Sequence, residues 1–272
     1  MGAINRVTLQ PGYVLHHWPY RDTSLLVEIL TRDHGRVGMV ARGAKRSKSR
    51  LYGILQPFIP LVFSWTDKGE LGTLVNAEPQ GPVTWPEGRA MINGFYVNEL
   101  LLRLLHRHDP HPHLFEEYCR VLQRLSSLNG YANKNISPAH HEEQRSLRIF
   151  EKNLLRELGY GLVLDHDMST GEAIKSDGVY TYILDMGPVL NTDASVSSIR
   201  HKNNFECVML SGRSLISLAQ DELEDARSLQ ESKKLMRAVL KRYLGDKPLG
   251  SRNLFHSLAH SAAAQSTTTT DT

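Results

Sequence analysis

Cysteine is scarce in this chain of 272 residues, which contains only Cys119 and Cys207. Two thiols are too few for a disulfide framework or for a four-thiolate zinc site. The sequence also lacks an apolar run near the roughly 18 residues that a membrane-spanning helix needs, and its N-terminus lacks the apolar core of a signal peptide. These absences predict a soluble, cytoplasmic protein.

The sequence signatures of common catalytic sites are missing as well. The chain has no G-x-S-x-G, no H-E-x-x-H, no P-loop and no G-x-G-x-x-G. The run HRHDPHPH at residues 106–113 offers several imidazoles, but two prolines interrupt it and its spacing matches no helical metal motif. We interpret it as a polar turn and expect no enzyme, no cofactor and no bound metal. A metal-dependent enzyme that uses this run is the less favoured alternative.

Acidic residues are absent from residues 34–66, and this absence creates a local excess of positive charge. Residues 1–66 carry nine Lys and Arg against three Asp and Glu, a net charge of +6, whereas the remaining 206 residues carry 23 against 26. Five of the nine cations lie in ARGAKRSKSR, residues 41–50. A positive field confined to one part of a protein raises the local concentration of polyanions, so a polyanionic ligand is expected there.

Short runs rich in β-branched and aromatic residues occupy the first 80 positions, and turn signals separate them. The runs are GYVLHHWPY, SLLVEILTR, GRVGMVARGA, PFIPLVFSWT and GTLVNAEPQ. RDHGR at 32–36 and DKGE at 67–70 predict hairpin turns. Five strands without intervening helices predict a small closed barrel, and five is the strand number of the OB-fold. An SH3-like barrel and an open sheet are the alternatives.

The periodicity becomes helical from about residue 85. Three amphipathic helices are predicted in FYVNELLLRLLHRH, LFEEYCRVLQRLSSL and HHEEQRSLRIFEKNLLRELGYG, and two more follow an irregular stretch that contains short strands. We therefore predict an α+β protein with an OB-fold domain at residues 1–82 and a mainly helical domain at 83–260. A β-rich insertion is expected at 161–210, and a disordered tail at 261–272.

The cationic stretch has the composition of a segment that holds a phosphate backbone. Its cations alternate with small residues, and such a mobile backbone lets several of them neutralise phosphates together; they are Arg42, Lys45, Arg46, Lys48 and Arg50. Aromatic residues that could stack on bases are near in the sequence: Tyr52, Trp18, Tyr20, Phe58, Phe63 and Trp65. We expect Phe63 or Trp65 to belong to the core instead. A solvated surface loop is the plain alternative.

A second set of cations follows the third predicted helix beside its apolar stripe. The cations are Arg145, Arg148, Lys152 and Arg156, and the apolar residues are Leu147, Phe150, Leu154 and Leu158. Glutamates partly balance the charge, so a solvated face is one interpretation. The other is a groove for an acidic peptide with a hydrophobic end.

Three separated motifs resemble the RecO family of bacterial recombination and repair mediators. The segment GYVLHHWPYRDTSLLVEILTRDHGRVGMVARGAKRSKSRLYGILQPFIPLVFSW is similar to the family's N-terminal domain. LRIFEKNLLRELGYGL and YLGDKPLGSRNLF are similar to signatures of its helical domain, and the three motifs occur in the expected order across residues 8–258.

The resemblance implies a cytoplasmic, nucleoid-associated protein that binds single- and double-stranded DNA without sequence specificity and anneals complementary strands. The resemblance further implies that the protein works with RecR to load RecA onto strands coated by single-stranded DNA-binding protein. It also implies that the protein binds the acidic C-terminal tail of that coating protein. The DNA contacts would be Arg36, Arg42, Lys45, Arg46, Lys48 and Arg50, with Tyr52 beside them; the tail contacts would be Arg148, Leu147, Phe150 and Lys152. An OB-fold RNA-binding factor is an alternative with the same charge pattern.

Some members of that family carry a four-cysteine zinc module after the LGYG sequence. Here residues 160–210 contain only Cys207, with His166 and Asp167 as isolated candidates. We therefore expect the insertion to be β structure without a metal.

Overall fold

The computed structural model describes residues 5–67, 71–81, 85–129, 138–191, 206–251 and 253–254. The chain forms two compact units, one of residues 1–133 with 248–272 and one of residues 134–247. Helices α1 (Gly88–Leu104) and α2 (Pro112–Ser127) belong to the first unit. The domain boundary predicted at residues 82 and 83 precedes α1, whereas the two units divide between residues 133 and 134. The predicted turn at 67–70 lies outside the described residues except for Asp67, as does the whole tail at 261–272.

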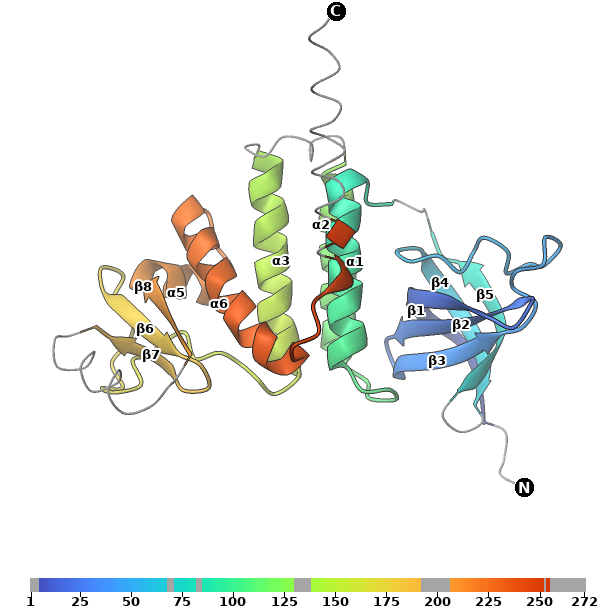
Figure 1. Ribbon diagram of the computed structural model, residues 1–272, viewed down its shortest axis with the longest axis horizontal. Helices are drawn as coiled ribbons and strands as arrows, with labels where there is room; N and C mark the ends of the chain where they lie inside the picture. Colours follow the sequence, from blue (N-terminus) through green and yellow to red (C-terminus); the bar gives the residue numbers. More distant parts are fainter. Residues whose placement is uncertain are drawn as a thin grey trace, which may run out of the picture. The chain divides into compact units, whose positions relative to one another are not determined.

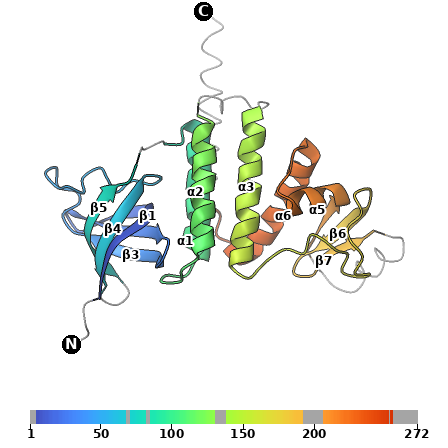
Figure 2. The same cartoon turned by 180° about the vertical axis from the view of Figure 1, so that it is seen from behind.

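Five strands close into a barrel in the first unit (Figures 1 and 2). They are β1 (Asn5–Tyr20), β2 (Ser24–Thr31), β3 (Gly35–Ala41), β4 (Pro60–Asp67) and β5 (Gly72–Pro79). The order is β1-β2-β3-β5-β4, and β4 pairs back onto β1. The β3–β5 pair is parallel and the other pairs are antiparallel. The predicted five-stranded barrel of OB type is confirmed, and the open sheet is excluded.

Alternate side chains of the strands fill the barrel, because successive residues of a strand point to opposite faces. Val27 and Ile29 of β2 and Met39 of β3 are fully buried in this core. Phe63 and Trp65 of β4 are buried with them, so the prediction that Phe63 or Trp65 belongs to the core is confirmed, and it holds for both residues.

A bulge in β1 attaches the barrel to the two helices of its unit. The register of β1 against β2 shifts between Val14 and His16, which leaves Leu15 without a strand partner. The Leu15 carbonyl instead accepts a hydrogen bond from Asn98 Nδ2 of α1 at 2.9 Å. The Tyr118 hydroxyl of α2 donates to Asn98 Oδ1 at 2.7 Å, so one buried amide joins a strand and two helices.

A buried carboxylate makes a second attachment. Glu28 of β2 is almost completely buried and accepts from Arg36 Nε of β3 at 2.9 Å. The guanidinium of Arg107, in the α1–α2 connection, forms a close ion pair with the same carboxylate. Arg36 also donates to the carbonyls of Leu102 and Leu105, which are left open at the end of α1. Three charged side chains thus fix the end of α1 to the outside of the barrel.

Two glycines of β3 leave room for this attachment. A Cβ on Gly38 would lie 2.8 Å from Arg107 Cζ and 2.9 Å from Glu28 Oε1. A Cβ on Gly35 would lie 2.1 Å from the Asp109 carbonyl oxygen, and Gly35 also has a φ of +64°. The predicted turn at 32–36 is therefore confirmed, and its glycine serves both backbone conformation and close packing.

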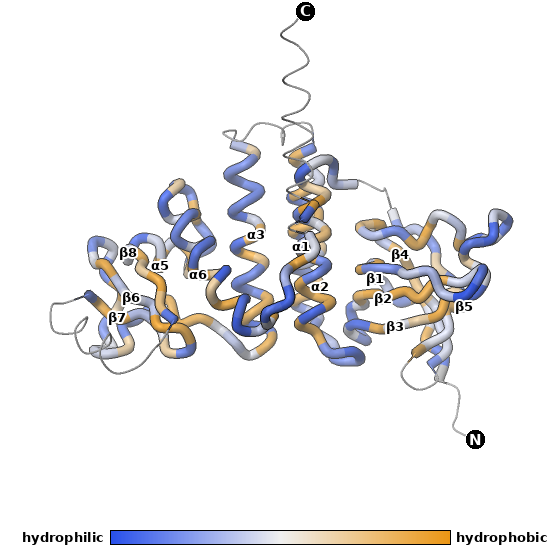
Figure 3. The backbone as a smooth tube through the Cα atoms, in the orientation of Figure 1, coloured by the Kyte–Doolittle hydropathy of each residue, from blue (hydrophilic) through white to orange (hydrophobic). Residues whose placement is uncertain are grey.

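In its described residues, the second unit combines three helices with a small antiparallel sheet of order β7-β6-β8. Its elements are α3 (Pro138–Glu157), β6 (Val179–Ile183), β7 (Gly187–Leu190), β8 (Cys207–Ser211), α5 (Gly212–Ala219) and α6 (Ala226–Leu244). In Figure 3 the first half of α3 is mainly hydrophilic, and apolar bands appear in its second half. The helical domain with a β-rich insertion is confirmed. None of the helices in the described ranges is long and apolar enough to cross a bilayer.

An aspartate organises the insertion. Asp167 accepts from the Ser169 and Thr170 amides through Oδ1 and from the Leu190 amide through Oδ2, at 2.7, 3.1 and 2.6 Å. These bonds tie the loop after α3 to β7. Within the described residues, no three His, Cys, Asp or Glu side chains gather as ligands of a metal ion, and Cys207 is exposed.

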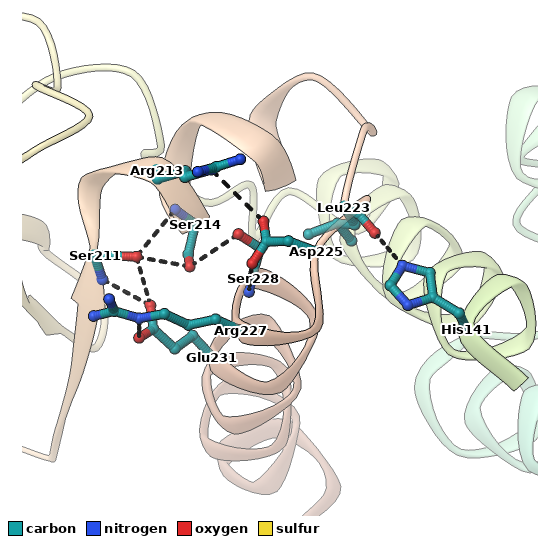
Figure 4. Close-up of polar contacts among 9 residues, drawn as sticks. All are labelled: His141, Ser211, Arg213, Ser214, Leu223, Asp225, Arg227, Ser228 and Glu231. Atoms are coloured by element: carbon teal, nitrogen blue, oxygen red, sulfur yellow. Dashed lines mark hydrogen bonds and ion pairs between the residues drawn. The ribbon is translucent and has the colours of Figure 1, made fainter. Parts of the chain in front are cut away.

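A polar network joins the starts of α5 and α6 (Figure 4). Ser211 caps α5 and Asp225 caps α6, each by accepting from the amide three residues later. Glu231 of α6 accepts from the Ser211 amide at 2.7 Å, from the Ser211 hydroxyl at 2.9 Å and from Arg227 Nε at 2.8 Å. Burial alone would raise the pKa of Glu231, but these hydrogen bonds outweigh burial and lower the pKa to about 2.

Replacing Glu28 with Gln removes the charge that Arg36 and Arg107 share. We expect the free energy of unfolding to fall by about 3–5 kcal/mol, because one partner of a buried ion pair is lost while the other charges stay in place. Urea denaturation at neutral pH measures this loss. The control is Glu116→Gln, whose exposed carboxylate lies 3.5 Å from Arg32; it should cost less than about 1 kcal/mol. Equal losses in the two variants would contradict the role of Glu28.

The Glu231 network predicts a pH dependence of stability. Because the folded-state pKa lies below its ordinary value of 4.5, the carboxylate stabilises the fold above about pH 4.5, and this contribution disappears as the pH falls toward 2. Glu231→Gln should lower the free energy of unfolding by on the order of 2–3 kcal/mol at neutral pH, and the difference from wild type should shrink on acidification. Glu224→Gln, which changes an exposed carboxylate, is the control. A difference that stays constant from pH 7 to pH 3 would refute the assignment.

Candidate nucleic-acid interface

The connection between β3 and β4 contains a regular series of turns. We call residues 42–52 the cation loop. The amides of Arg46, Ser49 and Tyr52 donate to the carbonyls of Gly43, Arg46 and Ser49, at 3.1, 2.9 and 3.1 Å. Each bond closes a four-residue turn, so hydrogen bonds constrain the backbone where its composition alone predicts a mobile segment.

The cation loop is attached to the barrel at both ends. The Lys45 amide donates to the Thr23 carbonyl at 2.9 Å, which binds the loop to the β1–β2 turn. Ala44 and Leu55 are buried in the barrel core, and Leu51 and Ile54 pack against it. The apolar residues therefore hold the loop backbone in place.

Its charged side chains all face solvent. Arg42, Lys45, Arg46, Lys48 and Arg50 are exposed. In the described parts of the chain none of them forms an ion pair, in agreement with the absence of acids from residues 34–66. Five unpaired cations on one anchored loop produce a positive surface that can accept several phosphates.

Arg36 does not belong to this surface. Its guanidinium is mostly buried, pairs with Glu28 and donates to carbonyls at the end of α1. The structure therefore gives Arg36 a role in holding the fold, and it gives no support to Arg36 as a DNA contact. The position of Arg36 near the other cations in the sequence does not reveal this role, because its partners at the end of α1 lie more than 60 residues away.

The aromatic residues near the loop fall into two groups. Tyr52 is 59% exposed and Trp18 is 40% exposed, whereas Phe58 is buried with its ring against Phe95 of α1. Tyr52 is therefore available to a ligand of the cation loop. Trp18 is exposed because it pairs with Leu26, which points to the outer face of β2. The bulge at Leu15 interrupts the alternation of inward and outward residues along β1, so the sequence alone does not show which face Trp18 occupies.

The histidine-rich run forms the connection between α1 and α2. His108 donates its amide to the Arg36 carbonyl at 2.9 Å, and His111 lies 3.3 Å from the Asp109 carboxylate. The interpretation as a polar turn between helices is confirmed. In the ranges that the structure covers, these side chains join no three-residue set of metal ligands.

Of the four predicted tail contacts on α3, three are buried and the fourth, Lys152, is partly exposed but engaged in polar contacts. Leu147 and Phe150 are buried, and the side chain of Arg148 is 5% exposed with its guanidinium 2.6 Å from Glu151. Lys152 Nζ contacts the Asp221 carboxylate at 2.7 Å and the Leu218 carbonyl at the end of α5 at 2.9 Å. As they stand, these residues form no open groove. Arg156 of the same helix is exposed.

Comparisons with known proteins agree with this architecture. Family models described as "Recombination protein O N terminal" and "Recombination protein O C terminal" match residues 6–83 and 87–253. Proteins named DNA repair protein RecO from Nitrosococcus oceani and Nitrosospira multiformis are both 44% identical to this chain. The alignments cover 93% and 92% of this chain and 94% and 95% of those proteins. The chain therefore belongs to the RecO family of DNA repair proteins, which are non-enzymatic recombination mediators.

Proposed function

We propose that this recombination mediator binds single- and double-stranded DNA through the cation loop and anneals complementary strands. The observation that carries the proposal is the set of five exposed cations on an anchored loop of the OB-type barrel, none of which forms an ion pair with the residues that the structure describes. Lys and Arg side chains contact phosphates without reading bases, so such a surface accepts any sequence. Neutralising the phosphates of two strands also lowers their repulsion, which favours pairing.

The same proposal includes partners. Family membership supports work with RecR in loading RecA onto strands coated by single-stranded DNA-binding protein, on nucleoid DNA in the bacterial cytoplasm. We also propose that the helical part binds the acidic C-terminal tail of that coating protein. Because Arg148, Leu147, Phe150 and Lys152 are packed, a tail that binds them must first open their surroundings.

The loop proposal predicts a loss of salt-dependent affinity. Replacing Arg46, Lys48 and Arg50 with Ala should lower the affinity for a single-stranded oligonucleotide by one or more orders of magnitude at physiological salt. The slope of log affinity against log salt should fall by about 0.7 for each cation that engages a phosphate. Fluorescence anisotropy over a series of salt concentrations measures both quantities.

A variant with the same change of net charge serves as the control for this experiment. Lys175, Arg213 and Lys241 are exposed cations of the second unit, and replacing them with Ala should leave the slope nearly unchanged. If the two triple variants behave alike, net charge and not the cation loop determines binding. Tighter binding to RNA than to DNA of equal length would favour an RNA-binding factor.

The tail proposal needs a test that separates contact from folding. Arg148→Ala leaves the buried Glu151 without its ion pair and should cost about 3–5 kcal/mol of stability. The double variant Arg148→Met with Glu151→Gln removes both charges, so it should be more stable than Arg148→Ala. If Arg148 contacts the tail, the double variant should bind an acidic tail peptide at least about tenfold more weakly while it binds naked DNA normally. Wild-type affinity for the peptide would exclude Arg148 as a contact.

A further inference from the structure

The outer face of the barrel carries an apolar row beside the cation loop. Trp18 of β1 pairs with Leu26 of β2, and Leu26 pairs with Val40 of β3. Val27 and Met39, their neighbours in the chain, point into the core. Leu26 and Val40 therefore point outward by alternation, and both remain partly exposed. The row crosses three strands, a width of about 10 Å at the usual strand spacing.

The indole of Trp18 packs against a neighbouring ring although it is 40% exposed. The His16 ring meets it edge-on, with 4.3 Å between ring centroids and an interplanar angle of 75°. Burial and then the neighbouring His17 lower the pKa of His16, so His16 is a neutral ring at physiological pH. An aromatic ring that already packs against a neighbour loses less conformational entropy when a ligand stacks on it.

This row adjoins the start of the cation loop. Tyr20, two residues beyond Trp18, pairs with Ser24, whose hydroxyl accepts from the Gly43 amide of the loop at 3.4 Å. The Lys45 amide is bound to Thr23 of the same turn. Arg21 adds a further cation, with its guanidinium carbon 5.2 Å from the centroid of the Tyr20 ring. Exposed aromatic surface and unpaired positive charge therefore meet at the β1–β2 turn.

We infer that Trp18, with Tyr20 beside it, is a stacking surface for unpaired bases of a DNA strand whose phosphates lie on the cation loop. The inference rests on the proposed function: the cation loop binds the phosphates of a DNA strand, and the aromatic surface binds the bases of the same strand. The adjacent positive charge selects a polyanion over a neutral apolar partner. A base in a duplex already has both faces stacked, so this surface favours single strands, whereas the cations accept either form.

The test compares two probes with the same phosphates: a single-stranded oligothymidylate and an abasic oligomer of equal length. Stacking on Trp18 should make wild-type protein prefer the oligothymidylate, and Trp18→Ala should reduce that preference by on the order of 5- to 100-fold. The matched control is Trp85→Phe, because Trp85 is a similarly exposed tryptophan of the same unit at 38%. The triple loop variant should lower the affinity for both probes by the same factor, so the ratio of the two affinities should stay as in the wild type.

A second measurement does not depend on the stability of Trp18→Ala. In the Trp85→Phe protein the remaining tryptophans are Trp18 and the buried Trp65. Oligothymidylate should quench the exposed component of the fluorescence, and the abasic oligomer should quench it much less.

Each outcome separates the inference from the proposed function. If Trp18→Ala does not change the ratio of affinities for the two probes, or if both probes quench the fluorescence equally, the stacking surface is wrong. Neither result bears on the role of the cation loop. Equal loss for both probes in Trp18→Ala also overturns it, because the tryptophan then acts through the fold or as part of a protein-binding surface. Failure of the triple loop variant to weaken either probe instead overturns the proposed function.

Discussion

The first unit depends on one buried carboxylate. Glu28 lies under two guanidiniums, one from the next strand and one from the connection between two helices. Burying a charge is expensive unless hydrogen bonds and opposite charge compensate, and both do so here. The arrangement needs Gly38 beneath Arg107 and the open carbonyls of α1 beside Arg36, so strand, turn and helix end are determined together. The Trp18 row lies on the same outer face of the barrel, two residues along β2 from Glu28, and Trp18 remains 40% exposed there.

The same kind of residue has two different fates in this chain, and nearby acids decide which one applies. Arg36 and Arg148 each form an ion pair with a buried carboxylate, so a partner within the protein neutralises their charge. The five cations of the cation loop have no acid in the surrounding sequence and none as an ion-pair partner in the described structure. Their charge is therefore left for a ligand. The acid-free stretch 34–66 alone does not separate the two cases, because Arg36 lies within it and still pairs with Glu28 from the preceding strand.

Features that depend on local sequence were predictable. The five strands, the turn at Gly35 and the core position of Trp65 all follow from periodicity and from the conformational freedom of glycine. Features that depend on distant partners were not. The parallel β3–β5 pair and the bulge at Leu15 depend on residues that lie far apart in the sequence. The burial of Arg148 depends on the elements that pack against α3, and the sequence of α3 does not identify them. The resemblance to a family located the cations but could not separate Arg36 from the five that are exposed.

An anchored loop suits the proposed binding of both single- and double-stranded DNA. The backbone of the cation loop is fixed by three turns and by Ala44 and Leu55 in the core, so binding need not order it. Its Lys and Arg side chains are long and rotatable, and they can reach phosphates at the different spacings of a single strand and a duplex. Adaptability then resides in the side chains, whereas the barrel fixes where the charge is placed. Under this proposal the cation loop does not distinguish single strands from duplexes, and the exposed aromatic row next to the loop has the chemistry to do so.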